Sequence, residues 1–171
     1  MGIDVAVALG GNIGSQEIIV ARMQGVLDAF RTQKASNLMV SRVFQTKPFQ
    51  TEEGQDWYLN CVFHYQALEG EPPLSFLEWT KELEKELGRE NKGDLQPRTM
   101  DIDVLWIGKG VLQRKELTLP HPKIKERRFV LEPLLDIYPK NFKQEHLGDS
   151  LSNLFLESPK ESVVPLGWLL Q

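Results

Sequence analysis

The hydrophobic pattern of the first 35 residues predicts a strand followed by a helix. Ile3–Leu9 is a short, mostly β-branched apolar run that leads directly into Gly10 and Gly11, so we predict a buried strand ending in a glycine-rich turn. Ser15 is placed to cap a helix over residues 16–33. Apolar residues recur at helical spacing along this segment and predict its buried side: Ile19, Met23, Val26, Leu27 and Phe30.

The middle of the chain repeats the alternation of strand and helix. Residues 38–45 alternate in polarity and predict a strand, which Pro48 ends before a polar loop over 49–57. The next strand has an apolar face made of Leu59, Cys61, Phe63, Tyr65 and Ala67 and a second face with Asn60, His64 and Gln66. A proline pair precedes a second helix, which Gly88 ends. Its predicted inward side holds Leu77, Thr80, Leu83 and Leu87.

The later segments are predicted as a loop at 89–98, a strand at Met100–Ile107, short strands at 111–112 and 117–119, and a helix from about 125 to 137 that Pro133 interrupts. The order of strand, helix, strand, strand, helix, strand is typical of an α+β fold of the ferredoxin-like (βαββαβ) type. In that fold two helices pack on one face of an antiparallel sheet, and here C-terminal additions follow. We predict a single domain over residues 1–171, with its motifs within about 3–138 and a tail, 139–171, that carries no readable motif.

Composition and charge restrict the partners. The formal net charge of -4 makes the 171-residue chain a poor candidate for binding nucleic acid, and none is expected as a partner. The single cysteine excludes an intrachain disulfide, and no run approaches the roughly 18 apolar residues that span a membrane. The first residues lack the basic region of a signal peptide. We therefore expect a cytoplasmic protein with no membrane partner. We also expect it to be a monomer, although no feature of the sequence fixes the oligomeric state.

Two aspartates give the sharpest chemical signal. Asp101 and Asp103 are predicted to project from one face of their strand, because alternate residues share a face. Met100, Ile102 and Val104 point to the other face. Two carboxylates about 7 Å apart repel each other unless a cation lies between them, and Mg²⁺ suits oxygen ligands beside phosphates. The pattern alone leaves open the alternative that both residues lie on the solvated face of an edge strand.

Two further motifs suggest a ligand only when they are combined with the aspartates. Pro120-His121-Pro122 precedes Arg127, and arginine forks match phosphate oxygens while a histidine can donate to phosphate or ribose. Alone, this segment is better explained as a basic helix start after a turn. Tyr58 and Asn60 follow a loop, and together they could stack on and hydrogen-bond to a flat polar heterocycle. Alone, they are better explained as ordinary loop packing.

Taken together, these motifs resemble the 6-hydroxymethyl-7,8-dihydropterin pyrophosphokinase family over roughly residues 5–135. The resemblance is carried by Leu9-Gly10-Gly11-Asn12, Ser41 to Pro48, Tyr58-Leu59-Asn60, Glu84, Gly88-Arg89, Pro97-Arg98-Thr99-Met100-Asp101-Ile102-Asp103, Pro120-His121-Pro122, and Arg127 with Phe129-Val130-Leu131. The Arg-Thr-x-Asp-x-Asp and Pro-His-Pro pieces are its most specific parts.

The resemblance implies an enzyme of folate biosynthesis that transfers the diphosphoryl group of Mg-ATP to the hydroxymethyl oxygen of the reduced pterin and releases AMP. It implies two Mg²⁺ ions held by Asp101 and Asp103, with ATP as co-substrate. The catalytic residues implied are Arg89, Arg98, Asp101 and Asp103. The ATP-binding residues implied are Lys81, Glu84, Arg89, Arg98, Val104, Thr118, His121 and Arg127. The pterin-binding residues implied are Gly10, Thr46, Lys47, Pro48, Phe49, Tyr58, Asn60, Asp101 and Phe129.

The sequence departs from the family pattern in two places. Arg89 is followed by Glu90-Asn91-Lys92, where the family carries a second arginine, and Gly11 stands where serine is usual. The first departure bears on loop closure and rate and leaves the reaction class intact. Two alternatives are a non-catalytic ferredoxin-like module that binds a small molecule and a metal-dependent enzyme of nucleic acid, against which the net charge argues. The resemblance also allows association with neighbouring folate-pathway enzymes.

Overall fold

A computed structural model describes residues 2–35, 37–47, 57–67, 72–88 and 99–171 of the chain. Its elements, in chain order, are β1 (Ile3–Gly11), α1 (Gln16–Gln33), β2 (Met39–Val40), β3 (Phe44–Thr46), β4 (Tyr58–Ala67), α2 (Pro73–Glu86), β5 (Asp101–Ile107), β6 (Leu112–Gln113), β7 (Thr118–Leu119), a 3₁₀ turn (Ile124–Glu126), α3 (Arg128–Ile137), α4 (Leu151–Glu157) and β8 (Val163–Pro165). The predicted loops at 49–57 and 89–98 lie outside the described residues, apart from Trp57.

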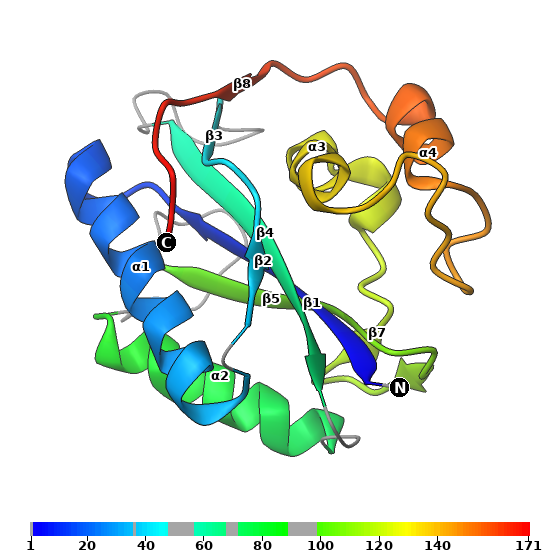
Figure 1. Ribbon diagram of the computed structural model, residues 1–171, viewed down its shortest axis with the longest axis horizontal. Coiled ribbons are helices and arrows are strands. Elements are labelled where there is room, and N and C mark those ends of the chain that lie inside the picture. The colour runs from blue at the N-terminus through cyan, green and yellow to red at the C-terminus, as the bar shows by residue number, and fades with distance from the viewer. Residues whose placement is uncertain (1, 36, 48–56, 68–71, 89–98) are drawn as a thin grey trace.

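The strands form one antiparallel sheet with helices on both faces (Figure 1). Its order is β5-β1-β4-β3-β8, and β2 also pairs with β4. Helices α1 and α2 cover one face, and α3 and α4 cover the other. Strands β6 and β7 form a separate two-stranded ribbon. The predicted mixed fold with an antiparallel sheet is thus confirmed, and the two C-terminal helices bury the face that α1 and α2 leave uncovered.

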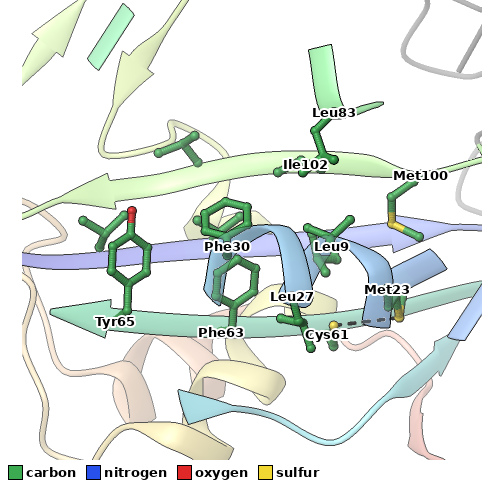
Figure 2. Packing of buried hydrophobic residues seen from close by; sticks show 14 of the residues in the cluster. Leu9, Met23, Leu27, Phe30, Cys61, Phe63, Tyr65, Leu83, Met100 and Ile102 are labelled. Carbon is green, nitrogen blue, oxygen red and sulfur yellow. Dashed lines mark hydrogen bonds between the residues drawn. The ribbon is translucent and has the colours of Figure 1, made fainter. Parts of the chain in front are cut away.

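Helix α1 forms as its sequence predicts. The Ser15 hydroxyl accepts a hydrogen bond from the Ile18 amide (3.4 Å) and caps the helix. The buried residues of α1 are the five predicted ones, Ile19, Met23, Val26, Leu27 and Phe30. Figure 2 shows three of them against the apolar face of β4, where the rings of Phe30 and Phe63 meet edge to face with centroids 4.7 Å apart. This layer is the larger of the two cores.

The predicted strand at 38–45 was wrong as a single element, because the chain forms the two short strands β2 and β3. Ser41, between them, donates its backbone N–H to the Val62 carbonyl (2.8 Å). The Val62 amide then donates to the Ser41 hydroxyl (2.9 Å) instead of to a backbone carbonyl, which interrupts the ladder. Such a local side-chain acceptor competes with strand pairing and cannot be read from polarity alternation.

Several predicted element boundaries were also wrong. Strand β1 continues through Gly10 and Gly11, which pair with Asn60 and Leu59 instead of forming a turn. In α2, Phe76 and Glu84 are buried together with the predicted Thr80 and Leu83, and Gly88 follows the helix with a φ of 85°. Helix α3 begins at Arg128, after the 3₁₀ turn, and it runs through Pro133 without ending. Within the described residues, none of the helices has both the length and the apolar run that crossing a bilayer requires.

Candidate active site at the open edge of the sheet

The two aspartates lie on β5, the edge strand that the tail leaves unpaired. Met100, Ile102 and Val104 are buried in the core between the sheet and the first two helices. Asp101 and Asp103 point to the opposite face and are half-buried, as the strand alternation predicts. Both line a groove of about 310 Å³, so the alternative of two aspartates that decorate a solvated edge does not describe them.

Asp103 is held by basic groups that come from the segment after β7. The Arg127 guanidinium donates to the Asp103 carboxylate with Nη1 and Oδ2 3.0 Å apart. The His121 Nε2 atom lies 4.0 Å from the same oxygen. All three side chains are partly exposed, at 32% for Asp103, 25% for Arg127 and 19% for His121, so an anion or cation from solvent can reach them. The carboxylate is therefore positioned and still accessible.

His121 is a neutral donor in this arrangement. Burial and, to a smaller extent, the positive charges of Arg127 and Lys123 lower the pKa of His121 to about 4, although Asp101 acts in the opposite direction. The Lys123 backbone N–H donates to His121 Nδ1 (3.2 Å), which leaves the ring proton on Nε2, the atom that faces Asp103. The His121 amide donates to the Leu105 carbonyl (2.7 Å), which fixes the histidine beside β5. The ring can thus donate one hydrogen bond into the groove near neutral pH.

The groove brings together residues from four segments of the chain. It is lined by Leu77, Lys81, Glu84, Asp101, Ile102, Asp103, Val104, Lys115, Glu116, Leu117, Thr118, His121 and Pro122. Lys81, Glu84, Val104, Thr118 and His121, all predicted to bind ATP, are among them. The connection between β6 and β7 also contributes Lys115 and Glu116, which the sequence did not mark as site residues. Arg127 reaches the groove through Asp103.

Glu84 links α2 to the edge strand. Its side chain is only 6% exposed, and its Oε1 atom accepts a hydrogen bond from the Ile102 amide (2.7 Å). Because Ile102 lies between the two aspartates, this bond fixes the backbone from which both carboxylates project. A buried acceptor on a neighbouring helix satisfies an edge-strand N–H that would otherwise face water.

A polar row crosses the sheet from the aspartates toward β3. Asp101 pairs with Gly10, and Gly10 pairs with Asn60, so the three residues lie side by side on the face that α3 covers. The buried Asn60 side chain donates to the Thr46 hydroxyl (2.9 Å), and Thr46 lies opposite Tyr58 in the next row. A Cβ on Gly10 would lie 3.0 Å from Asn60 Oδ1, so glycine leaves space above the amide.

The other residues predicted to bind pterin are less closely grouped or are not described. Phe129 lies at the start of α3, and the Arg127 guanidinium is 5.6 Å from the centre of its ring. Lys47 lies over the ring of Trp57, at 5.4 Å. Pro48 and Phe49 fall outside the described residues, and so do Arg89 and Arg98, which were predicted as catalytic and ATP-binding residues. The structure therefore brings together Gly10, Thr46, Tyr58, Asn60 and Asp101, and the roles of all these residues stay predictions.

The carboxylates on β5 suit a metal ion whose remaining ligands are phosphate oxygens and water. Within the described ranges, no group of three or more His, Cys, Asp or Glu side chains is arranged to enclose a metal ion. The strand instead offers two carboxylates at the open groove. Mg²⁺ commonly binds through one or two carboxylates, with phosphate oxygens and water completing its shell. Asp101 and Asp103 therefore fit Mg²⁺ that arrives with a nucleotide and do not form a metal cage of their own.

Comparison with known proteins places the chain in a family of pyrophosphokinases. The family model for 7,8-dihydro-6-hydroxymethylpterin-pyrophosphokinase (HPPK) matches residues 6–139. The chain belongs to this family, as the resemblance predicts. The match ends where the tail predicted as motif-free begins.

Individual relatives agree with the family. The chain is 33% identical over 131 residues to the 2-amino-4-hydroxy-6-hydroxymethyldihydropteridine pyrophosphokinase of Bacillus subtilis, covering 77% of this chain and 75% of the relative. It is 34% identical over 138 residues to a folate synthesis bifunctional protein of Arabidopsis thaliana, covering 78% of this chain but only 27% of the relative. The chain thus spans about a quarter of that longer relative. The bifunctional protein FolKE of Lactococcus lactis is a further fused relative, at 29% identity.

Solved structures support the fold alone. The HPPK-DHPS of Plasmodium falciparum, crystallised with pteroate, superimposes with a TM-score of 0.68 at 13% sequence identity. It covers 92% of this chain, and this chain covers 44% of it. The same architecture is therefore also found within a longer chain.

Proposed function

We propose that this chain transfers the diphosphoryl group of ATP to the hydroxymethyl oxygen of 6-hydroxymethyl-7,8-dihydropterin and releases AMP. One observation supports this most strongly: Asp101 and Asp103 project from one strand at the junction of an open groove and a polar row across the sheet. A donor nucleotide in the groove and an acceptor on the row would meet at these carboxylates.

The groove suits the nucleotide. We assign the adenosine to the part between α2 and the β6–β7 ribbon, where Glu84, Val104 and Thr118 line the walls. The phosphates would extend toward His121 and Arg127, whose donors are positioned around Asp103. Guanidinium and imidazole donors match the charge of a phosphate chain, and Arg89 and Arg98 join them in this proposal.

The polar row suits the pterin. Asn60 offers amide donor and acceptor groups on a rigid strand, and its bond to Thr46 fixes which way the amide faces. Gly10 leaves room for a flat ring to approach, and Tyr58 and Phe129 are the aromatic side chains assigned to stack on it. We include Lys47, Pro48 and Phe49 in the same pocket.

The reaction asks the protein mainly for positioning and charge neutralisation. The pterin hydroxymethyl oxygen forms a bond to the β-phosphorus of ATP, the bond between the β-phosphorus and the oxygen of the α-phosphate breaks, and the hydroxyl proton is released. Asp101 and Asp103 would hold two Mg²⁺ ions, and bound Mg²⁺ supplies charge neutralisation on the phosphates. His121 donates from Nε2 to a phosphate oxygen, and Arg127 holds Asp103 in place while offsetting negative charge.

The proposal also includes the fold type, the oligomeric state, the location and the partners of the chain. We assign the sheet and its first two helices to the ferredoxin-like βαββαβ fold, because β3 and β5 flank β4 and β1 in the order that this fold requires. We propose that residues 1–171 act as one catalytic unit, a monomer in the cytoplasm that associates with other enzymes of folate synthesis. The fusion of relatives to further folate-pathway enzymes supports that association.

The direct test is pterin-dependent AMP formation. The purified chain is incubated with ATP, Mg²⁺ and 6-hydroxymethyl-7,8-dihydropterin, and AMP is quantified by chromatography while mass spectrometry identifies the diphosphorylated pterin. We expect both products in equal amounts and no AMP when the pterin is omitted. Pterin binding without AMP formation would refute the transfer and leave the non-catalytic binding module. ADP in place of AMP would refute diphosphoryl transfer in particular.

A further inference from the structure

The C-terminal segment 163–171 crosses the edge of the sheet opposite to the groove. Strand β8 pairs with β3 in antiparallel register, with Thr46 opposite Val163, Gln45 opposite Val164 and Phe44 opposite Pro165. Strand β3 therefore lies between β4 and β8 and is not an edge strand. Residues 140–171 lie beyond the family match, which ends at residue 139.

The segment is anchored on both sides of the sheet. Upstream of β8, Arg128 of α3 lies over the ring of Phe155 in α4, with the guanidinium carbon 3.8 Å from the ring centre. Downstream, Leu166, Trp168 and Leu170 pack against the core that α1 helps to form. The last residue exchanges hydrogen bonds with the Gln24 side chain of α1, at 2.8 and 3.1 Å. The chain end thus runs from α4, along β3, to α1 (Figure 1).

Strand β3 needs this support because it is only three residues long. A strand of this length at an open edge has one set of ladder bonds and frays easily. Its last residue, Thr46, accepts the bond that orients the Asn60 amide (2.9 Å). Loosening β3 would therefore release Asn60, which belongs to the proposed pterin pocket, while the groove on β5 lies three strands away.

We propose that β8 is a positioning element for the acceptor substrate: by pairing with β3, it holds Thr46 and through it the Asn60 amide that binds the heterocycle. This inference rests on the proposed function for the identity of the ligand. Val164 is the positioning residue, and it acts through its backbone, because its side chain is 44% exposed. The nucleotide groove is independent of it.

The ladder itself supplies a matched pair of variants. The Leu166 amide donates to the Val43 carbonyl (2.8 Å), and the two-residue period of an antiparallel ladder makes Val164 and Gln45 the next pair that exchanges hydrogen bonds. Val164→Pro removes one of those donors. Val163 lies two residues before the native Pro165, so the backbone nitrogens of both residues point away from β3. Val163→Pro therefore removes no hydrogen bond to β3. Both variants change valine to proline on the same strand.

The experiment measures equilibrium dissociation constants of full-length variants for the dihydropterin in the presence of a non-hydrolysable ATP analogue, and for the analogue alone. We expect Val164→Pro to weaken pterin binding at least fivefold and nucleotide binding less than twofold. Val163→Pro should change neither by more than twofold. Amide hydrogen exchange, followed by mass spectrometry, should rise over residues 44–46 only in Val164→Pro. Equal pterin affinity for both proline variants, with exchange raised in Val164→Pro, would overturn the proposal.

A second pair tests the anchor if Val164→Pro does not fold. Trp168→Ala removes a side chain that packs on the core, and Leu169→Ala removes its neighbour, which is 78% exposed. We expect the KM for pterin to rise at least threefold in Trp168→Ala alone, with the KM for ATP and kcat unchanged. A parallel rise in the KM for ATP would reduce the segment to a general stabiliser and refute the inference. Hydrogen exchange can be measured without turnover. If the wild-type chain formed no AMP, the proposed function would be rejected, but hydrogen exchange would still test whether β8 holds β3 in place.

Discussion

Asp4 and Asp103 lie on the same face of the sheet, but they differ in how many protein donors surround each carboxylate. Asp4, on β1, accepts hydrogen bonds on both oxygens: from Trp106 and Tyr138 on Oδ2, each at 2.8 Å, and from Gln66 on Oδ1 at 3.1 Å. The His64 ring lies 2.9 Å from Oδ1 as well. Asp103, on β5, faces the open groove and is contacted by Arg127 and, at longer range, by His121.

The two carboxylates differ in whether a ligand could still bind to them. Four donors from protein side chains surround Asp4, so a ligand could bind it only by breaking bonds that the fold uses. Burial alone would raise the pKa of Asp4, but the hydrogen bonds from His64, Trp106 and Tyr138 outweigh it and lower the pKa below 3.8. Asp103 keeps an accessible side toward the groove, which is what a site for a charged ligand requires. Hydrogen-bond saturation, rather than burial, distinguishes the two.

The largest expected effect is on catalysis, from the groove carboxylates. Asp101→Ala combined with Asp103→Ala should reduce AMP formation by a factor of about 10³ or more, because phosphate charge is no longer neutralised where it develops. The melting temperature should change by only a few degrees, since both side chains are partly exposed. Initial rates of AMP release measure the effect on catalysis, and thermal unfolding measures the change in melting temperature. Normal turnover in the double variant would show that these aspartates are as structural as Asp4.

The next effect is on stability, from the saturated carboxylate. Asp4→Asn puts an amide donor against two other donors, and we expect it to cost about 2–4 kcal/mol in the free energy of unfolding. Because the pKa of Asp4 is lowered in the folded state, its contribution is present above pH 3.8, the unfolded value, and is lost as pH falls through the folded pKa. The stability difference between wild type and Asp4→Asn should therefore shrink as the pH falls below 3.8.

Urea unfolding at pH 7 and at stepwise lower pH measures that difference. AMP formation per folded molecule should stay within twofold of wild type at 15 °C, roughly where small domains are most stable. A variant that is as stable as wild type at pH 7 would contradict the structural role of the cluster. A selective loss of AMP formation would place Asp4 with the functional carboxylates.

The smallest effects come from the two histidines. His121→Ala removes a donor beside the phosphates and should lower kcat/KM for ATP about tenfold, close to 1.4 kcal/mol, with little change in stability. His64→Ala removes a ring that packs 4.4 Å from Tyr138 and should lower the unfolding free energy by about 1–2 kcal/mol with no kinetic change. Steady-state kinetics and urea unfolding of both variants test the contrast. A kinetic defect in His64→Ala would show that the residues around Asp4 also affect the proposed active site.

The sequence by itself determined the features that depend on local periodicity. The stripe of α1, the apolar face of β4 and the opposite projection of Asp101 and Ile102 follow from repeats of 3.6 and 2 residues, which any short window of the chain contains. The motif around the aspartates was specific enough to point to the family that the comparisons then showed. Boundaries failed where a side chain replaced a backbone partner, as Ser41 does beside Val62.

Only the tertiary structure decided which distant residues meet. Asp4 is surrounded by residues 64, 66, 106 and 138, and no pattern near Asp4 marks it as a hydrogen-bond hub. The tail carries no motif, yet β8 in the tail pairs with β3. The sequence predicted short strands on either side of Lys115, but it did not show that they place this residue in the groove. The contacts of Asp4 and the pairing of β3 with β8 join residues 60 to 134 positions apart in the sequence, and such non-local contacts cannot be read from composition or periodicity.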